Sequence, residues 1–312
     1  MVGDADDGIV WRLDPGNNDR AALLLALGSA LAGERTPRSA SARWLLNAFP
    51  GQHPRSMKPV QSGAWAFPDG GYLLFGRDFG AAREIKGLLD CGPLGYLGIA
   101  AHGHADALSL TLSVAGEECL VDPGTYSYWQ DQKWRDYFRG TSAHNTVRVD
   151  GVDQSVSGGR FMWVRKARSH VERMPQSPGQ FDFRGTHNGY MRLADPARHI
   201  REVKFDDTNS TLVVTDRVAA KGAHIVEQFW HFAPGLVVTR NAGGVHVRGK
   251  AFQLQLDISG EGAAVELVRG QEDPPLGWYS RSYEAKQPCE VVKITTNASG
   301  ATLECRFTIS FS

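Results

Sequence analysis

The fold of this chain is decided by an alternating stretch in its first half. Residues 107–122 read ALSLTLSVAGEECLVD. Every second residue from 108 to 112 is leucine and the residues between them are Ser and Thr, which is the period of a half-buried β-strand. An Ala-Gly-Glu step at 115–117 marks a turn, after which apolar residues resume. The stretch therefore predicts an antiparallel hairpin with strands at 107–114 and 118–122.

The same pattern extends outward from this hairpin. From about residue 58 to residue 312, short alternating apolar runs recur between Gly, Pro, Asn and Asp turn signals, which is typical of a sandwich. No period in the range of roughly 20–50 residues repeats, so neither a propeller nor a solenoid is indicated. We expect an all-β fold, a large antiparallel β-sandwich over residues 58–312. The other expected strands are 63–67, 71–76, 143–149, 164–172, 180–185, 199–205, 211–218, 224–231, 236–240, 244–248, 251–258, 263–268, 289–295 and 301–311.

The N-terminal part has a different pattern. Asn17-Asn18-Asp19 caps a stretch rich in Ala and Leu, Arg20–Ala32, which reads as a helix. Ser39–Phe49 reads as a second short helix because a proline follows it. We expect residues 1–57 to form a short helical segment that precedes the β-sandwich.

Composition and charge exclude several classes of protein. The 312 residues include 34 Lys and Arg and 34 Asp and Glu, so net charge gives no general attraction to nucleic acid or to an anionic membrane. The longest apolar run, Ala21–Ala32, is too short to span a bilayer, and Met1–Asp7 does not read as a signal peptide. The four cysteines have no CxxC spacing, so neither a disulfide framework nor a thiolate metal site is indicated. We expect no nucleic acid partner and no membrane partner.

Residues capable of chemistry gather between positions 101 and 151. His102, His104 and Asp106 occupy every second position, so they would share one face if the strand at 107–114 extended backwards. Two such imidazoles and a carboxylate from another segment form a donor set that suits zinc. An isolated His-x-His pattern is nevertheless common without a metal.

Two later residues are candidates for the remaining ligands. Asp122 ends an apolar strand just before a Pro-Gly step, and His144 stands at the mouth of a strand. The same residues also fit a plain turn and a hydrogen-bonded polar pair of His144 with Asn145. If the loop at 115–116 held only two residues, Asp122 would pair opposite Ser109 and point away from the histidine face. Convergence therefore requires a three-residue loop or a β-bulge.

Several motifs in this region together resemble one family. They are Gly92–Tyr96, HGHAD at 102–106, VDPGTY at 121–126, AHNTV at 143–147 and VDGVDQ at 149–154. In order, spacing and identity they resemble the C-terminal domain of the heparinase II/III-like polysaccharide lyases. The resemblance covers most of the chain from about residue 58, and the helical segment resembles the end of that family's preceding helical domain.

The resemblance implies an architecture and a reaction. In this family an (α/α) toroid precedes the antiparallel β-sandwich, and an acidic polysaccharide lies between them. Glycans that contain uronic acid are cleaved by β-elimination, which needs a group to neutralise the carboxylate, a base for the C5 proton and an acid for the leaving oxygen. The neutralising residue and a catalytic Tyr come from the toroid. We therefore expect little turnover from this chain unless a toroid domain or a partner chain supplies them, and a periplasmic or extracellular location.

The resemblance also assigns roles to individual histidines. His102 matches the first His of the family's His-x-His motif, which is implied to act on the substrate as an acid, a base or a carboxylate-polarising group. His104, Asp122 and His144 match positions that bind a structural zinc ion in several members, and such an ion would brace the wall of the cleft. The resemblance thus implies zinc as a structural cofactor.

Three tyrosines and two arginines near these histidines are further candidates. Tyr137 lies where family members place a second catalytic Tyr, although Tyr126 and Tyr128 remain rivals for this role. Arg135 and Arg139 are candidates for bidentate pairing with substrate carboxylates.

Two classes of function stay open at this point. The chain is either the β-sandwich part of a lyase or a zinc-braced carbohydrate-binding or structural domain without turnover. A glycoside hydrolase is less favoured, because no clustered pair of carboxylates occurs in the motif region. A zero net charge also argues against a strongly sulfated substrate.

Overall fold

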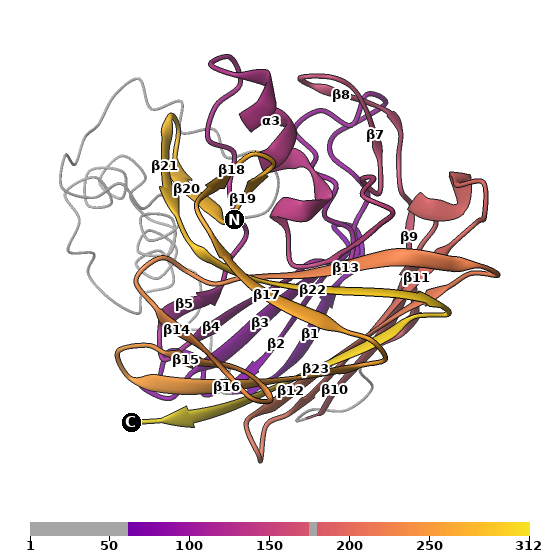
Figure 1. The fold of residues 1–312 in the computed structure, drawn as a ribbon. Helices are drawn as coiled ribbons and strands as arrows, with labels where there is room; N and C mark the ends of the chain where they lie inside the picture. Colours follow the sequence, from indigo (N-terminus) through magenta and orange to yellow (C-terminus); the bar gives the residue numbers. More distant parts are fainter. Residues whose placement is uncertain (1–61, 175–179) are drawn as a thin grey trace, which may run out of the picture. The chain divides into compact units, whose positions relative to one another are not determined.

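The computed structural model describes residues 62–174 and 180–312 (Figure 1). Within them the expected all-β class and antiparallel sandwich are confirmed, because one α-helix, α3 (Gln132–Arg139), and the 3-10 turns η1 (Thr141–Ala143) and η2 (Gly189–Arg192) are all that interrupt the strands. The strands are β1 (Ser62–Phe67), β2 (Tyr72–Arg77), β3 (Ile85–Asp90), β4 (Leu110–Val114), β5 (Glu117–Leu120), β6 (Val147–Val149), β7 (Val156–Gly159), β8 (Met162–Arg165), β9 (Ser169–Arg173), β10 (Gln180–His187), β11 (Arg198–Asp206), β12 (Thr211–Ala219), β13 (Ala223–His231), β14 (Val237–Asn241), β15 (Gly244–Arg248), β16 (Phe252–Gly260), β17 (Ala264–Arg269), β18 (Gln271–Glu272), β19 (Pro275–Leu276), β20 (Trp278–Ser282), β21 (Ala285–Pro288), β22 (Glu290–Ser299) and β23 (Thr302–Phe311).

Two expectations from the sequence concern residues that the structure does not describe. The helical segment expected over residues 1–57 and the domain boundary expected at residue 58 lie outside the described residues. Along the part of the chain that is described, no helix is long and apolar enough to cross a membrane.

The strands form three main sheets and three hairpins within the described residues. The sheets have the orders β1-β2-β3-β4-β5, β14-β15-β16-β23-β12-β11-β10-β9 and β17-β22-β13-β6. The hairpins are β7–β8, β18–β19 and β20–β21. In Figure 1 these hairpins and α3 lie toward the top, and the eight-stranded sheet lies at the bottom. The hairpins and α3 thus gather at one end of the sheets.

Aromatic side chains join the sheets through the core. The ring of Phe75 in β2 stacks on that of Phe181 in β10 with centroids 4.3 Å apart, so the five-stranded and eight-stranded sheets are in contact. Trp230 in β13 packs edge-on against Phe307 in β23 at 5.0 Å, which joins the four-stranded sheet to the eight-stranded one. All four side chains are 3% exposed or less. Burial of each is worth roughly 1.5–3 kcal/mol, so the sheets hold one another together.

The hairpin that the sequence predicted contains a β-bulge. Val114 pairs with Glu117 across a short loop, but Leu112 pairs with Leu120, so the register shifts by one residue within β5. Cys119 and Leu120 are consequently both buried, whereas a regular strand would alternate. With this shift Leu120, two residues before Asp122, lies opposite Leu112, so the β-bulge predicted from the sequence as one route to convergence is present.

A buried ion pair lies at the centre of the eight-stranded sheet. Arg201 in β11 and Asp216 in β12 are directly opposite each other, and both are at most 1% exposed. The Arg201 guanidinium donates from Nε and Nη2 to the two Asp216 oxygens, at 2.7 Å each. Its remaining nitrogen, Nη1, donates at 2.6 Å to the backbone carbonyls of Leu108 and Asn145. One guanidinium therefore fixes two loops next to the predicted metal ligands.

Two neutral histidines extend this network. The backbone N–H of Gly189 donates to Nδ1 of His187, so the proton of His187 is on Nε2, which donates to Nδ1 of His199 at 3.0 Å. His199 in turn donates from Nε2 to Asp216 at 2.7 Å. Each ring thus has one donor and one acceptor engaged, and burial lowers the pKa of both histidines.

We predict that Arg201→Met lowers the free energy of unfolding by about 3–5 kcal/mol, because it leaves the Asp216 carboxylate buried without its counter-charge. Urea unfolding measures the loss. As the matched control, Arg184→Met removes two ion pairs, with Glu172 and Glu202, whose side chains are about one third exposed, and we expect less than about 1 kcal/mol from it. Equal losses in the two variants would contradict the central role of Arg201.

Acidification should destabilise the fold from about pH 6.5 downward. His187 and His199 stay neutral when folded because their pKa values are lowered, whereas an unfolded histidine takes up a proton near pH 6.5. The unfolded state then binds more protons, so the free energy of unfolding falls by up to about 1.4 kcal/mol per pH unit for each histidine. In urea unfolding between pH 7 and 5, His187→Gln should reduce this slope, and His170→Gln, at an exposed position of β9, should not.

Candidate functional site

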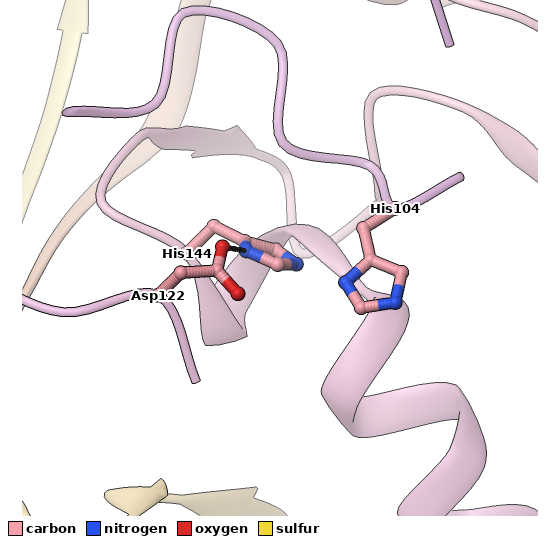
Figure 2. A group of neighbouring side chains, drawn as sticks. All are labelled: His104, Asp122 and His144. Atoms are coloured by element: carbon pink, nitrogen blue, oxygen red, sulfur yellow. Dashed lines mark hydrogen bonds and ion pairs between the residues drawn. The ribbon is translucent and has the colours of Figure 1, made fainter. Parts of the chain in front are cut away.

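The structure brings His104, Asp122 and His144 together from three separate segments. One ligand atom of each lies within 4.8 Å of the others. The three side chains come from the loop before β4, the end of the β4–β5 hairpin and the turn between α3 and β6 (Figure 2). Their residues are 1%, 6% and 0% exposed, so they form a closed centre rather than an open one.

The Pro-Gly step after Asp122 fixes the direction of its carboxylate. Oδ1 accepts a hydrogen bond from the backbone N–H of Gly124, and Oδ2 lies 2.8 Å from Nδ1 of His144. Gly124 has φ +81° and its Cα approaches the carbonyl of Ser280 so closely that a Cβ atom would lie 2.1 Å from that oxygen. Only glycine therefore allows this turn to pack against β20.

Asn145 holds the backbone next to His144 in place. Its amide nitrogen donates to the carbonyls of Leu110 and Val121, at 2.8 and 3.0 Å, and its amide oxygen accepts from the backbone N–H of His231 at 2.6 Å. This one side chain therefore joins β4, the end of β5 and β13. The sequence offered Asn145 only as a polar partner of His144, and neither its bridging role nor His231 had been predicted.

The electrostatics of the centre favour a charged pair. Burial alone would raise the pKa of Asp122, but the imidazoles of His144 and His104 outweigh it and hold this pKa below the usual range. Burial would lower the pKa of His144, and the adjacent Asp122 carboxylate raises it instead. Burial and the charge of His144 lower the pKa of His231 to about 3, so this neighbour stays neutral.

Two further carboxyl groups lie beside the centre. Burial raises the pKa of Asp106, and the nearby Asp90 raises it further. Burial likewise raises the pKa of Asp90. Both residues and His104 line a cavity of about 10 Å³, which is about the space that one water molecule needs. The surroundings of the centre thus carry excess acid groups that a cation would stabilise.

The donor set fits a zinc ion. Two imidazoles and one carboxylate are common zinc ligands. The other nitrogen of His144, Nε2, is buried and has no hydrogen-bond partner among the described residues. In Figure 2 this nitrogen points toward His104, whose ring centroid is 5.2 Å from that of His144. A buried, unsatisfied nitrogen directed at the other ligands is expected where a metal binds.

His102 lies in a different environment from His104. It is exposed, and its ring centroid is 6.2 Å from that of Tyr128 and 6.3 Å from that of Phe161. The interpretation that His102, His104 and Asp106 share a strand face is wrong, because β4 begins only at Leu110. His102 has the left-handed φ of 61°, so the chain reverses there instead of alternating.

The three predicted tyrosines occupy different places. Tyr137 is 6% exposed, burial raises its pKa, and its hydroxyl accepts from the backbone N–H of Trp278 at 3.3 Å. Tyr126 donates its hydroxyl proton to Gln130 at 2.6 Å. Tyr128 is the one whose ring contacts His102. The structure therefore groups Tyr128, rather than Tyr137, with the exposed histidine.

Arg135 and Arg139 are buried in α3, with exposures of 0% and 2%. Arg135 donates from Nε and Nη2 to the carbonyl of Arg160, at 3.1 and 3.0 Å. Arg139 donates to the carbonyls of Gly159 and Met162. The two arginines, predicted as substrate ligands, thus hold the backbone of the β7–β8 hairpin.

That hairpin was not predicted as part of the site. The indole N–H of Trp163 in β8 donates to the carbonyl of Gly103 at 2.9 Å, and its backbone N–H donates to the carbonyl of Ile99 at 3.0 Å. The hairpin therefore supports the loop that carries His102 and His104. The available signal was the row of large residues Phe161, Met162 and Trp163.

Comparisons with known proteins agree with this fold and with these motifs. A family model for the C-terminal domain of heparinase II/III-like proteins matches residues 59–309. Similar solved structures include "Heparinase III-BT4657 gene product", with a TM-score of 0.69, 16% identity and coverage of 92% of this chain and 41% of that chain. Heparan sulfate lyase HepC from Pedobacter heparinus has a TM-score of 0.70, 14% identity and coverage of 100% and 44%.

The chain therefore spans about two fifths of the length of these structures, and at such identity the likeness concerns the fold. A search of curated proteins finds no match. Because the family model covers residues 59–309, the chain belongs to the heparinase II/III-like family, and the part that matches is that family's C-terminal domain.

Proposed function

We propose that this chain is the β-sandwich part of a polysaccharide lyase that cleaves uronic-acid-containing glycans by β-elimination. The observation that carries the proposal is the exposed His102 beside the buried centre of His104, Asp122 and His144, in a chain of this family. The similar structures named above are a heparinase III and a heparan sulfate lyase. The protein would bind the acidic polysaccharide in the periplasm or outside the cell.

His102 is the proposed group for proton transfer at the sugar. Its exposed ring lies next to the half-buried ring of Tyr128, whose hydroxyl is buried, so one imidazole and one phenol lie side by side. These are the two residue types that such an elimination uses to remove the C5 proton and to protonate the leaving oxygen. Tyr137 stays a prediction for this role, and the contact of the Tyr128 ring with His102 favours Tyr128, although the hydroxyls of both tyrosines are buried.

The group that neutralises the uronate carboxylate would come from elsewhere. We propose that a helical toroid domain or a partner chain supplies it, together with a further Tyr. Arg135 and Arg139 stay predictions as substrate ligands, and their burial favours an indirect role through the β7–β8 hairpin. Without the second half of the site, orientation of the substrate is lost, and turnover should be low.

The proposed metal is structural. His104, Asp122 and His144 would hold a zinc ion, which supplies a positive charge that neutralises the buried carboxylates and braces the three segments. His104 and His102 are two residues apart, so fixing the first restrains the loop that presents the second.

The same centre would also suit a zinc-braced carbohydrate-binding or structural domain without turnover. The two functions differ in their product. A lyase leaves unsaturated uronates that absorb ultraviolet light, whereas a binding domain leaves the glycan intact.

We predict that His102→Ala, in this chain joined to its toroid, lowers kcat for β-elimination by about 10²–10⁴-fold, because proton transfer at the sugar is lost. Ultraviolet absorbance of the unsaturated product, on alginate and on heparan sulfate, measures the rate. His170→Ala, at an exposed position of β9, is the matched control and should keep the parent rate.

Two outcomes would contradict the prediction for His102→Ala. Saturated new ends would show that the reaction is hydrolysis, and the lyase proposal would fail. A full rate in His102→Ala would remove this residue from the chemistry even if the product is unsaturated.

We also predict that the purified protein holds about one zinc ion per chain, and that His104→Ala loses it. Elemental analysis measures the metal, and thermal unfolding with and without a chelator measures its contribution to stability. At a zinc concentration about 100-fold above Kd, binding should add about 2.7 kcal/mol to the free energy of unfolding. His102→Ala is the matched control that should retain the metal, and equal zinc in both variants would refute the ligand assignment.

A further inference from the structure

A strip of aromatic rings leads away from His102 across the surface. Trp129 is 66% exposed, and its ring centroid lies 5.4 Å from that of Phe161. Phe161 is half-buried and lies 5.2 Å from Tyr128, which in turn lies 5.4 Å from Tyr283. We call Trp129, Phe161, Tyr128 and Tyr283 the aromatic strip. A contiguous group of exposed and half-buried rings, unlike a single exposed ring, is typical of a binding surface.

The strip continues into a segment with charge of one sign. From Gln154 to Val171 the sequence contains three arginines, one lysine (Lys166) and one histidine (His170), but no Asp or Glu. This imbalance stands out in a chain whose 34 positive and 34 negative residues cancel. The segment is therefore a local positive patch that the net charge conceals.

Three of these cations are exposed and lack an acidic partner in the part of the chain that the structure describes. Arg165, Lys166 and Arg168 are exposed and form no ion pair within the described residues. We call these three residues the cationic edge. At about 3.3 Å per residue in an extended chain, they lie within roughly 25 Å of Phe161. That distance is the length of several sugar residues of a polysaccharide.

The backbone beneath the strip and the edge is held firmly. Arg135 and Arg139 donate to three carbonyls of the β7–β8 hairpin from below. Arg160 donates to the carbonyl of Tyr128, and its guanidinium stacks over the Trp129 ring with 5.4 Å to the centroid. Lys166 donates to the carbonyl of Gly98 at 2.6 Å, in the loop that leads to His102. A surface fixed in this way loses little conformational entropy when a ligand binds.

We propose that the aromatic strip and the cationic edge form a binding subsite for an anionic polysaccharide beside His102. The Trp129 ring packs against the apolar C–H face of one pyranose ring, and Arg165, Lys166 and Arg168 pair with carboxylate or sulfate groups of the sugars that follow. The inference rests on the proposed function and adds the residues that select the charge of the glycan. A protein partner is disfavoured, because an apolar interface would bury three cations without counter-charges.

The test is the affinity of this chain for three glycans, measured by isothermal titration calorimetry. Oligosaccharides of alginate carry carboxylates only, those of heparan sulfate carry sulfates as well, and those of dextran are neutral. The variant Arg165→Gln/Lys166→Gln/Arg168→Gln should bind the anionic oligosaccharides about tenfold more weakly, with a smaller dependence on salt. Arg240→Gln/Arg248→Gln/Lys250→Gln removes the same charges from exposed positions on or beside β14 and β15, and should leave the affinity unchanged.

The aromatic strip is tested in the same titrations. Trp129→Ala should weaken binding by about fivefold and Trp129→Phe should restore most of it, because a flat ring is what the sugar needs. Val237→Ala, an exposed apolar position on β14, is the control for loss of exposed apolar area. If the triple variant of the cationic edge loses more affinity for heparan sulfate than for alginate, the cationic edge binds sulfate groups. If it loses the same affinity for both, the cationic edge binds carboxylates.

The outcomes separate this inference from the proposed function. Equal loss of affinity in the two triple variants, or unchanged binding in Trp129→Ala, would overturn the subsite. Dextran binding equal to that of alginate would overturn the charge selection. Failure of the proposed function shows itself elsewhere, as absence of unsaturated uronates from the joined protein while the anionic glycans still bind.

Discussion

The rest of the structure depends on how the buried charge of Arg201 is satisfied. A guanidinium without water needs acceptors for its N–H groups, and here Asp216 accepts from two of the five while the carbonyls of Leu108 and Asn145 accept from the two on Nη1. These carbonyls belong to the two loops that carry His104 and His144. The requirement that stabilises the eight-stranded sheet therefore also sets the spacing of the candidate metal ligands, and stability and site geometry cannot vary independently.

The site separates two chemical environments over a very short length of chain. His104 is 1% exposed among carboxylates, whereas His102, two residues earlier, faces solvent beside Tyr128. The left-handed backbone at His102 makes this possible, because a regular strand would have put both rings on one face. The buried centre around His104 can thus restrain the exposed imidazole of His102 without itself contacting a substrate.

The alternating pattern predicted most of the long strands, because each has one buried face and one exposed face. It missed β3, whose sequence is interrupted by Lys86 and Gly87; a Cβ at Gly87 would lie 2.2 Å from the Phe75 ring, so packing across the sheet decided that residue. It also missed α3, a helix of only eight residues, whose buried apolar side chains Trp134, Tyr137 and Phe138 are interspersed with the buried Arg135 and Arg139. The motifs identified His104, Asp122 and His144, but the environment of Arg135 and Arg139 depends on a hairpin with no strong local signal.

The bulge at Cys119 makes binding depend on chain length as well as on residue identity. Loss of the extra residue at Cys119 would let β4 and β5 pair regularly with Leu120 still opposite Leu112, whereas loss of Val121 would keep this pairing and turn Asp122 to the opposite side. All three ligand residues would still be present in such a sequence, in the same order and in recognisable motifs. A deletion between Leu120 and Asp122 would therefore separate the fold from its metal centre, and an intact set of ligand residues does not guarantee an intact centre.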